Sequence, residues 1–404
     1  MAQDNYSLIL RTRPTSSSTT PSVIETITDM ASEWNRNKIY NGGADIGTFT
    51  VYGDANFLAP MWQTWLGLDI LETDQGIHTW NGQICRVELY AGSVAMARDI
   101  NLMYNRVRGT YVWGLEEPAD VWTSWYQNTY SQHKYGIREE KVDPPTDLKA
   151  DAELQVQYVL KMHGWPPRYP CANILKPGEQ PNLKVYVNGY KHSLNNRVIQ
   201  EDSSWWSSFF SGIGYQYEDV SVAIKDIIDN SDYVRAGRIA TNNHQILLDA
   251  GIGMKGGDFL DDLLEITDTS QNLYHGWIDN ERKFHYERFD NEPEYYVFNG
   301  EVYADSGATV AVAPRHIRPG IFRVMDFPVS GEDEASIFDD RRDVLIEDIS
   351  IDAGGVASYK PKSSAISDYV SYMESRKRYL LMTGFLEMLG EINSGSGSGY
   401  TCTE

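Results

Sequence analysis

Apolar and polar side chains alternate along several short stretches of the first 142 residues. The clearest stretch follows Trp80-Asn81-Gly82, where Cys85, Val87 and Leu89 alternate with polar neighbours. A period of two residues turns one set of side chains toward the core and the other toward water. We therefore predict a tight turn at residues 80–82, a half-buried strand after it, and further strands at residues 6–11, 45–52 and 102–113. Such short strands predict a small barrel or sandwich over residues 1–142.

Residues 143–200 are predicted to form a connecting domain of one helix and one strand. The helix covers residues 148–162, with Asp147 as its cap and Gly164 at its end. A strand follows at residues 183–187, and Asn188-Gly189 turns the chain after it. The apolar face of this helix is expected to hold Leu148, Ala152, Val156, Val159 and Leu160.

An α+β region is predicted over residues 201–362, including a second barrel-like part. Its clearest helix covers residues 219–228, where apolar side chains recur at helical spacing behind Asp219. A second helix is expected at residues 258–267, and Pro319-Gly320 is expected to turn the chain between two strands. The other strands are expected at residues 245–248, 273–278 and 283–289.

The C-terminal residues divide into a helix and a tail. Residues 363–393 are predicted to be helical because a broad apolar stripe recurs at helical spacing between Ile366 and Ile392. Residues 394–404 contain a Gly/Ser run and are predicted to form a flexible tail.

The composition of the 404-residue chain is that of a folded protein with two to four domains. Acidic residues outnumber basic ones 57 to 35, for a net charge of -22. This negative charge repels phosphate and argues against a surface that binds DNA tightly. Two explanations of the charge stay open: it keeps the protein soluble, or it lines a surface past which DNA slides. Cys85, Cys171 and Cys402 show no disulfide or metal spacing, which predicts synthesis in a reducing compartment. The sequence shows neither a signal peptide nor a run of about 20 apolar residues, so stable membrane insertion is not expected.

One glycine motif has the spacing of a dinucleotide-binding loop. Gly251-Ile-Gly253-Met-Lys-Gly256 matches G-x-G-x-x-G between a predicted strand and a predicted helix. That helix begins with Asp258 and Asp261-Asp262, and these charges would repel a pyrophosphate at the positive end of the helix. The motif is therefore interpreted as a glycine-rich loop, and no cofactor is expected.

Other candidates for chemistry are also weak. His275 and His285 lie on neighbouring predicted strands, but no third metal ligand is indicated. Acidic pairs such as Glu139-Glu140 are abundant, but a glycosidase needs two carboxylates that face each other across a cleft. We therefore predict no catalytic, cofactor-binding or metal-binding residue, and no enzyme activity.

Two apolar clusters are candidates for partner interfaces. One is aromatic, and such a patch more often marks a partner surface than a ligand site. A sugar-binding groove rich in Trp and Tyr is its alternative, so a carbohydrate-binding or carbohydrate-active protein is the second hypothesis. The other cluster lies in the predicted C-terminal helix, which can dock on a partner. The predicted interface residues are Trp205, Trp206, Phe209, Phe210, Phe385, Met388 and Leu389.

The order of short motifs resembles the hub proteins at the tail tip or baseplate of tailed bacteriophages. The resemblance covers about residues 40 to 355. Its strongest part is the stretch from Val310 to Asp326, which reads as a strand, a Pro-Gly turn and a second strand. Another similar segment is Tyr135-Gly136-Ile137-Arg138-Glu139, before the helix at residues 148–162. The other similar segments are Trp80-Asn81-Gly82-Gln83-Ile84, Val185-Tyr-Val-Asn-Gly189, residues 219–228, Tyr274-His-Gly-Trp277, Ile317-Arg318-Pro319-Gly320 with Val324-Met325-Asp326, and residues 348–352.

This resemblance implies a multidomain α+β fold of tail-tube-like β-barrel domains with inserted α/β domains and a C-terminal helix. It implies a homotrimer whose ring adapts a six-fold tail tube to a three-fold tip, with DNA and the tape measure protein passing through. The implied partners are a distal tail or tail tube protein, the tape measure protein and a tip or spike protein. The implied location is the virion tail, after assembly in the bacterial host cytoplasm.

Overall fold

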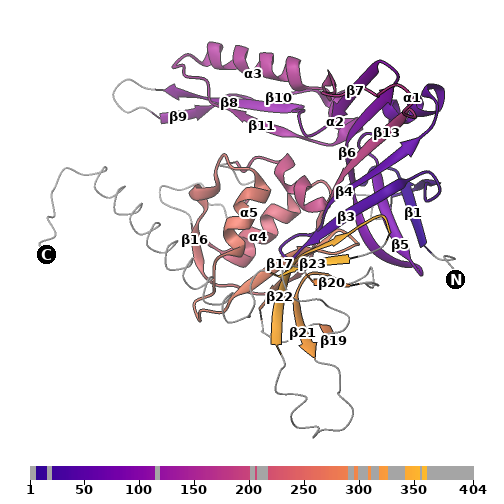
Figure 1. Ribbon diagram of the computed structural model, residues 1–404. Coiled ribbons are helices and arrows are strands. Elements are labelled where there is room, and N and C mark those ends of the chain that lie inside the picture. The colour runs from indigo at the N-terminus through magenta and orange to yellow at the C-terminus, as the bar shows by residue number, and fades with distance from the viewer. Residues whose placement is uncertain are drawn as a thin grey trace, which may run out of the picture.

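The computed structural model describes residues 6–15, 21–113, 119–200, 205–206, 217–289, 295–298, 308–310, 318–325, 342–354 and 357–361. Its largest sheet, here called the main sheet, is mostly antiparallel (Figure 1). The elements from the first 99 residues are β1 (Tyr6–Arg11), β2 (Val23–Thr26), β3 (Ser32–Ile39), β4 (Gly43–Tyr52), α1 (Ala55–Thr64), β5 (Asp69–Asp74), β6 (Ile77–Ala91) and β7 (Val94–Asp99).

A strand from the middle of the chain lies between two of these strands. β13 (Asn182–Asn188) pairs antiparallel with β4 on one side and with β6 on the other. Val185 stands opposite both Phe49 and Val87, and all three side chains are buried in one apolar core. Cross-strand pairs of this kind stabilise the sheet by burying apolar area on one face. The strands predicted at residues 6–11, 45–52 and 183–187 are confirmed.

A smaller sheet carries α3 on one face (Figure 1). Central strand β8 pairs in parallel with β11 and antiparallel with β9 and β10. α3 turns Ala152 and Val156 into the buried interior, and Gly109 of β8 leaves room for Val156. The elements here are β8 (Arg106–Trp113), β9 (Ala119–Trp122), β10 (Tyr126–Gln127), α2 (Thr129–Tyr135), β11 (Glu139–Val142) and α3 (Lys149–His163), followed by β12 (Arg168–Pro170), which pairs with β7.

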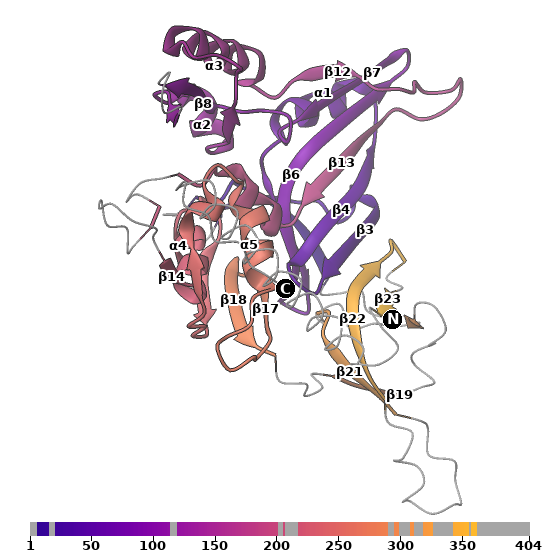
Figure 2. The same ribbon diagram turned by 90° about the vertical axis from the view of Figure 1, so that its left-hand side faces the viewer.

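A helical unit with its own apolar core lies next to the smaller sheet, and three of its strands, at residues 235–239, 274–278 and 283–288, belong to the main sheet (Figure 2). α4 buries Ile224 and Ile227 against Leu260 and Leu263 of α5, which confirms the helical pattern of both segments. The elements are η1 (Tyr190–Asn196), β14 (Tyr217–Asp219), α4 (Val220–Asp229), β15 (Arg235–Ile239), β16 (Gln245–Leu247), η2 (Leu248–Gly251), α5 (Gly256–Leu264), β17 (Tyr274–Ile278) and β18 (Lys283–Arg288).

The last described strands extend the main sheet. Antiparallel pairing of β22 with β3 sets Ser350 opposite Asn37 and joins the C-terminal strands to the N-terminal ones. The strands are β19 (Tyr295–Phe298), β20 (Ala308–Val310), β21 (Ile321–Met325), β22 (Arg342–Ile351) and β23 (Ala357–Pro361).

The tight turn predicted at Trp80-Asn81-Gly82 is wrong, because β6 runs straight through these residues and pairs with β5. Close packing explains the glycine. A Cβ at Gly82 would lie 2.5 Å from the Asn188 carbonyl oxygen and 2.7 Å from the Trp80 ring. Glycine is thus needed here because the backbone at Asn188 approaches too closely to leave room for a side chain.

Two further expectations need correction. Among the described strands no sheet closes into a barrel, so the predicted barrels are replaced by open sheets in a mostly antiparallel α+β fold. The capping prediction at Asp147 is also wrong: Leu148 occupies the N-cap position of α3, without a side-chain bond.

In the described part of the chain, no helix combines the length and the apolar character needed to cross a membrane. The predicted helix at residues 363–393 and the tail at residues 394–404 lie outside the described residues.

Candidate functional site

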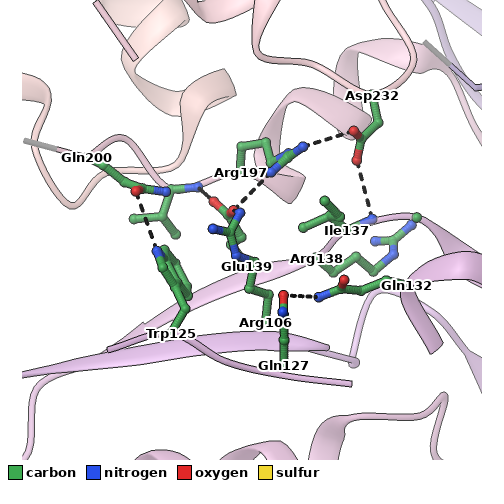
Figure 3. A network of polar contacts seen from close by, with 12 residues as sticks. Arg106, Trp125, Gln127, Gln132, Ile137, Arg138, Glu139, Arg197, Gln200 and Asp232 are labelled. Carbon is green, nitrogen blue, oxygen red and sulfur yellow. Dashed lines mark hydrogen bonds and ion pairs between the residues drawn. The ribbon is translucent and has the colours of Figure 1, made fainter. Parts of the chain in front are cut away.

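The segment Tyr135–Glu140 connects α2 to β11 and lies where the two sheets and the helical unit meet (Figure 3). Its backbone is held first by Asn105, just before β8. The Asn105 side chain accepts from the Arg138 amide at 2.8 Å and donates to the Gly136 carbonyl at 2.7 Å. We call this segment, together with the residues that bind it, the junction.

Glu139 is the most buried charge of the junction. One carboxylate oxygen accepts from Arg106 at 2.7 Å and from Arg197 at 3.0 Å, and the other accepts from the Val198 amide at 2.9 Å. The Glu139 side chain has no exposed area. A buried carboxylate is tolerated only when its oxygens are paired and hydrogen-bonded, as they are here. Glu139 therefore fastens β11 of the smaller sheet to the chain that enters the helical unit.

Arg197 carries this ionic chain into the helical unit. Its second nitrogen donates to Asp232 at 2.9 Å, and the other oxygen of Asp232 accepts from the Ile137 amide at 3.3 Å. Burial alone lowers the pKa of Arg197, but the Asp232 and Glu139 carboxylates outweigh it, so the pKa is raised. The guanidinium is therefore a permanent cation between two acids from different parts of the chain.

Arg138 links the junction to the main sheet. Its guanidinium donates to the side-chain oxygens of Asn196 at 2.9 Å and Gln83 at 3.3 Å. Burial lowers the pKa of Arg138. Gln83 belongs to β6 and Asn196 to η1, so Arg138 binds both the main sheet and the helical unit.

Tyr135 and Gly136 hold the start of the junction against Arg98 and Tyr233. The Tyr135 hydroxyl accepts from Arg98 at 3.1 Å, and the Tyr135 carbonyl accepts from the Tyr233 hydroxyl at 2.9 Å. Gly136 has a φ of 80°, and a Cβ on it would lie 2.0 Å from the Tyr233 oxygen. Both the backbone conformation and the space therefore require glycine.

The G-x-G-x-x-G loop contributes to the junction through a lysine. Lys255 donates to the Glu139 carbonyl and, at 2.7 Å, to the Glu140 carboxylate. Gly251 packs on Phe259, and a Cβ there would lie 2.6 Å from that ring. The loop thus packs against its own helix and binds β11, which agrees with its interpretation as a structural loop.

The polar groups of the junction bind one another and hold parts of the chain together. Three donors occupy the Glu139 oxygens, and two acids flank Arg197. A general base needs an oxygen free to accept a substrate proton, which Glu139 does not offer. The sequence predicts no ionic contact here, although this segment carries part of the resemblance described above. The one available signal was the run Arg138-Glu139-Glu140-Lys141, which is unusually charged for a strand.

Trp205 and Trp206 lie in the core of the helical unit, only 4% and 2% exposed. Their setting is therefore different from the exposed patch expected from the sequence, and their role in a partner interface stays a prediction. Phe209, Phe210, Phe385, Met388 and Leu389 lie outside the described residues.

His275 and His285 lie on the paired strands β17 and β18, but they are not brought together. Trp277 stands opposite His285, and His285 binds Asp279 at 2.9 Å. His275 is buried and stacks on Tyr40 with ring centroids 5.2 Å apart. Over the described ranges, no group of three or more potential ligands is arranged to hold a metal ion.

The burial of His275 predicts acid sensitivity. Burial, and secondarily the charge of Arg318, lowers the pKa of His275 from 6.5 to about 3. Between pH 6.5 and about 3, His275 is protonated in the unfolded chain and neutral in the folded chain. The free energy of unfolding therefore falls as the pH drops from 6.5 toward 3. Urea unfolding at pH 7 and pH 5 should show that His275→Phe loses less stability on acidification than the parent, by about 1.4 kcal/mol per pH unit in this window. An equal loss in both proteins would contradict the buried neutral imidazole.

No protein-family model matches the chain, and no curated protein matches it. Solved structures similar to it include the 43 kDa tail protein of prophage MuSo2 from Shewanella oneidensis, with 9% identity, a TM-score of 0.41, and coverage of 88% of this chain and 96% of that one. A tail protein from Neisseria meningitidis has 8% identity, a TM-score of 0.42, and coverage of 89% and 97%. A type VI secretion component from E. coli, described as structurally similar to two tail proteins of bacteriophage T4, has 10% identity, a TM-score of 0.39, and coverage of 82% and 74%.

Proposed function

We propose that this chain is a structural hub of a bacteriophage tail tip or baseplate. The observation that carries the proposal is the junction. The Tyr135–Glu139 segment, which resembles a motif of hub proteins, is the segment that ties both sheets to the helical unit. A hub must hold several domains in one fixed arrangement while other subunits attach to it. Buried charges that are paired across units favour one arrangement, because each misplaced partner leaves an unpaired charge behind.

In this proposal three copies form a ring between the tail tube and the tip. The partners are a distal tail or tail tube protein, the tape measure protein and a tip or spike protein, in a virion tail assembled in the host cytoplasm. DNA passes through the ring without binding, for which the net charge of -22 is suited. The role is that of a scaffold and channel, without enzymatic activity.

The native mass of the purified chain tests the trimer. Light scattering after size-exclusion chromatography should give three times the 45.9 kDa mass of one chain. Electron microscopy of the same fraction should show rings, and antibodies to the chain should label the distal end of the tail in virions. A stable monomer that is absent from virions would rule out the hub.

A further inference from the structure

The outer face of α3 is an apolar stripe without a cover among the described residues. Leu154, Tyr158 and Met162 are 63%, 61% and 56% exposed. They follow one another at a spacing of four residues, and they lie opposite Ala152 and Val156, which face the smaller sheet. Trp165, 48% exposed, follows just beyond the helix. Scattered apolar residues on a surface are ordinary, but an ordered ridge of large ones marks an interaction surface.

The geometry of this ridge favours a helix as its partner. A row of side chains four residues apart packs into the groove beside a similar row on another helix. The sequence offers such a row in the predicted C-terminal helix, where Leu381, Phe385 and Leu389 have the same spacing. Two triads of equal length can therefore interlock over about two helical turns.

Charge also matches between the two segments. Exposed Asp147 and Asp151 lie at the N-terminal end of α3. Arg376-Lys377-Arg378 directly precedes the second triad. When the two helices run in parallel, these opposite charges meet at the same end, and such complementarity fixes orientation and register.

We infer that α3 is the docking surface for the C-terminal segment, residues 376–392, of a neighbouring copy of this chain. α3 lies at one end of the molecule, and β23, from which the C-terminal segment continues, lies well away from it in both views (Figures 1 and 2). This separation favours a neighbouring copy as the source of the segment, and the inference commits to it. The inference rests on the proposed homotrimer and specifies one of its subunit contacts. In this contact Phe385 and Leu389 pack against the exposed face of α3.

Cysteine cross-linking in the full chain tests this contact. One tagged chain carries Tyr158→Cys and a differently tagged chain carries Phe385→Cys, both with Cys171→Ser and Cys402→Ser; buried Cys85 is kept. These two positions are central in their triads, so they meet in either helix orientation. Oxidation of the co-expressed chains should yield a disulfide between the two tags. The control pairs Phe385→Cys with Ile77→Cys, an exposed apolar residue of the main sheet. Docking holds the thiols at an effective concentration in the millimolar range, so the link should form about a hundredfold faster than in the control.

The outcomes separate this inference from the proposed function. A multimer that forms no Tyr158–Phe385 link, or forms it no faster than the control, overturns the docking and leaves the hub intact. A link found only inside one chain, in the Tyr158→Cys/Phe385→Cys double variant, assigns the segment to its own α3 and overturns docking between copies. A parent chain that is monomeric in the same preparation contradicts the trimer itself.

Discussion

Glu139→Gln should destabilise the chain by about 3 kcal/mol. The substitution keeps the size of the side chain but removes the charge that pairs with Arg106 and Arg197. It also turns an amide N–H₂ toward donors that previously shared two carboxylate oxygens. The large cost comes from Arg106 and Arg197, which would be left without their carboxylate partner. A charge that is removed from water and is not paired with an opposite charge is strongly unfavourable.

The neighbouring residue supplies a matched control. Glu140 bonds Lys255 at 2.7 Å, but both side chains are about a quarter exposed, at 26% and 25%. Glu140→Gln should therefore cost less than about 1 kcal/mol, as exposed ion pairs do. Urea unfolding at pH 7, followed by fluorescence and by circular dichroism, would compare the two variants. Equal costs for both would mean that the burial of Glu139 has no energetic role.

The same pair of variants probes whether the junction couples the units. If it does, the parent should unfold in a single transition, whereas Glu139→Gln should show transitions that differ between the two probes. Hydrogen exchange in α4 and in β11 would then rise together in this variant. Protection lost in β11 alone would place the effect in the smaller sheet and contradict coupling.

Local pattern was enough to predict the elements whose structure depends on local periodicity. α4 was predicted because its apolar residues recur at helical spacing and Asp219 stands at its N-cap position, although the Asp219 side chain makes no capping bond. The second half of β6 was predicted because Cys85, Val87 and Leu89 alternate with polar residues, and all three are buried. Periodicity reports which face of an element is buried, so it is informative where one face alone meets a core.

Such patterns do not predict which residues far apart in the sequence are in contact. β13 pairs with strands more than 90 residues earlier in the chain, and nothing in residues 182–188 specifies those partners. The junction joins Glu139 to Arg106 and Arg197, which are 33 and 58 residues away. Trp205 and Trp206 show the same limit, because an aromatic pair has equal apolar character in a core and on an interface.

Glycine was the most ambiguous signal, since it serves both turns and close packing. Gly82 is predicted to turn the chain and proves to be a packing residue inside β6. Gly136 ends α2 with a positive φ and also touches the Tyr233 hydroxyl. Only the position of the neighbouring segment distinguishes these uses, and that segment is nearly 100 residues away in the sequence.

Gly136→Ala should cost about 3 kcal/mol, in two parts that can be measured separately. The first part is backbone strain from an L-residue at a φ of 80°. The second is overpacking, because the new Cβ would lie 2.0 Å from the Tyr233 oxygen. Tyr233 is buried and cannot move without losing its bond to the Tyr135 carbonyl. Gly92→Ala is a control without overpacking, since Gly92 also has a positive φ, 63°, and a Cβ added there would meet nothing within 4 Å; this variant should cost about 1 kcal/mol.

A double-mutant cycle with Tyr233→Phe isolates the second part. Tyr233→Phe alone removes the buried bond to the Tyr135 carbonyl and the part-buried bond from Arg13, and it should cost about 1–2 kcal/mol. In the double variant the atom that clashes with Cβ is gone, so the combined cost should fall at least about 1 kcal/mol short of the sum of the two single costs. Strict additivity would show that the close approach of Tyr233 to Gly136 does not constrain the folded chain. A shortfall would show that the requirement for glycine in this segment is imposed by the helical unit packed against it, and hence that the segment and the unit are held as one body.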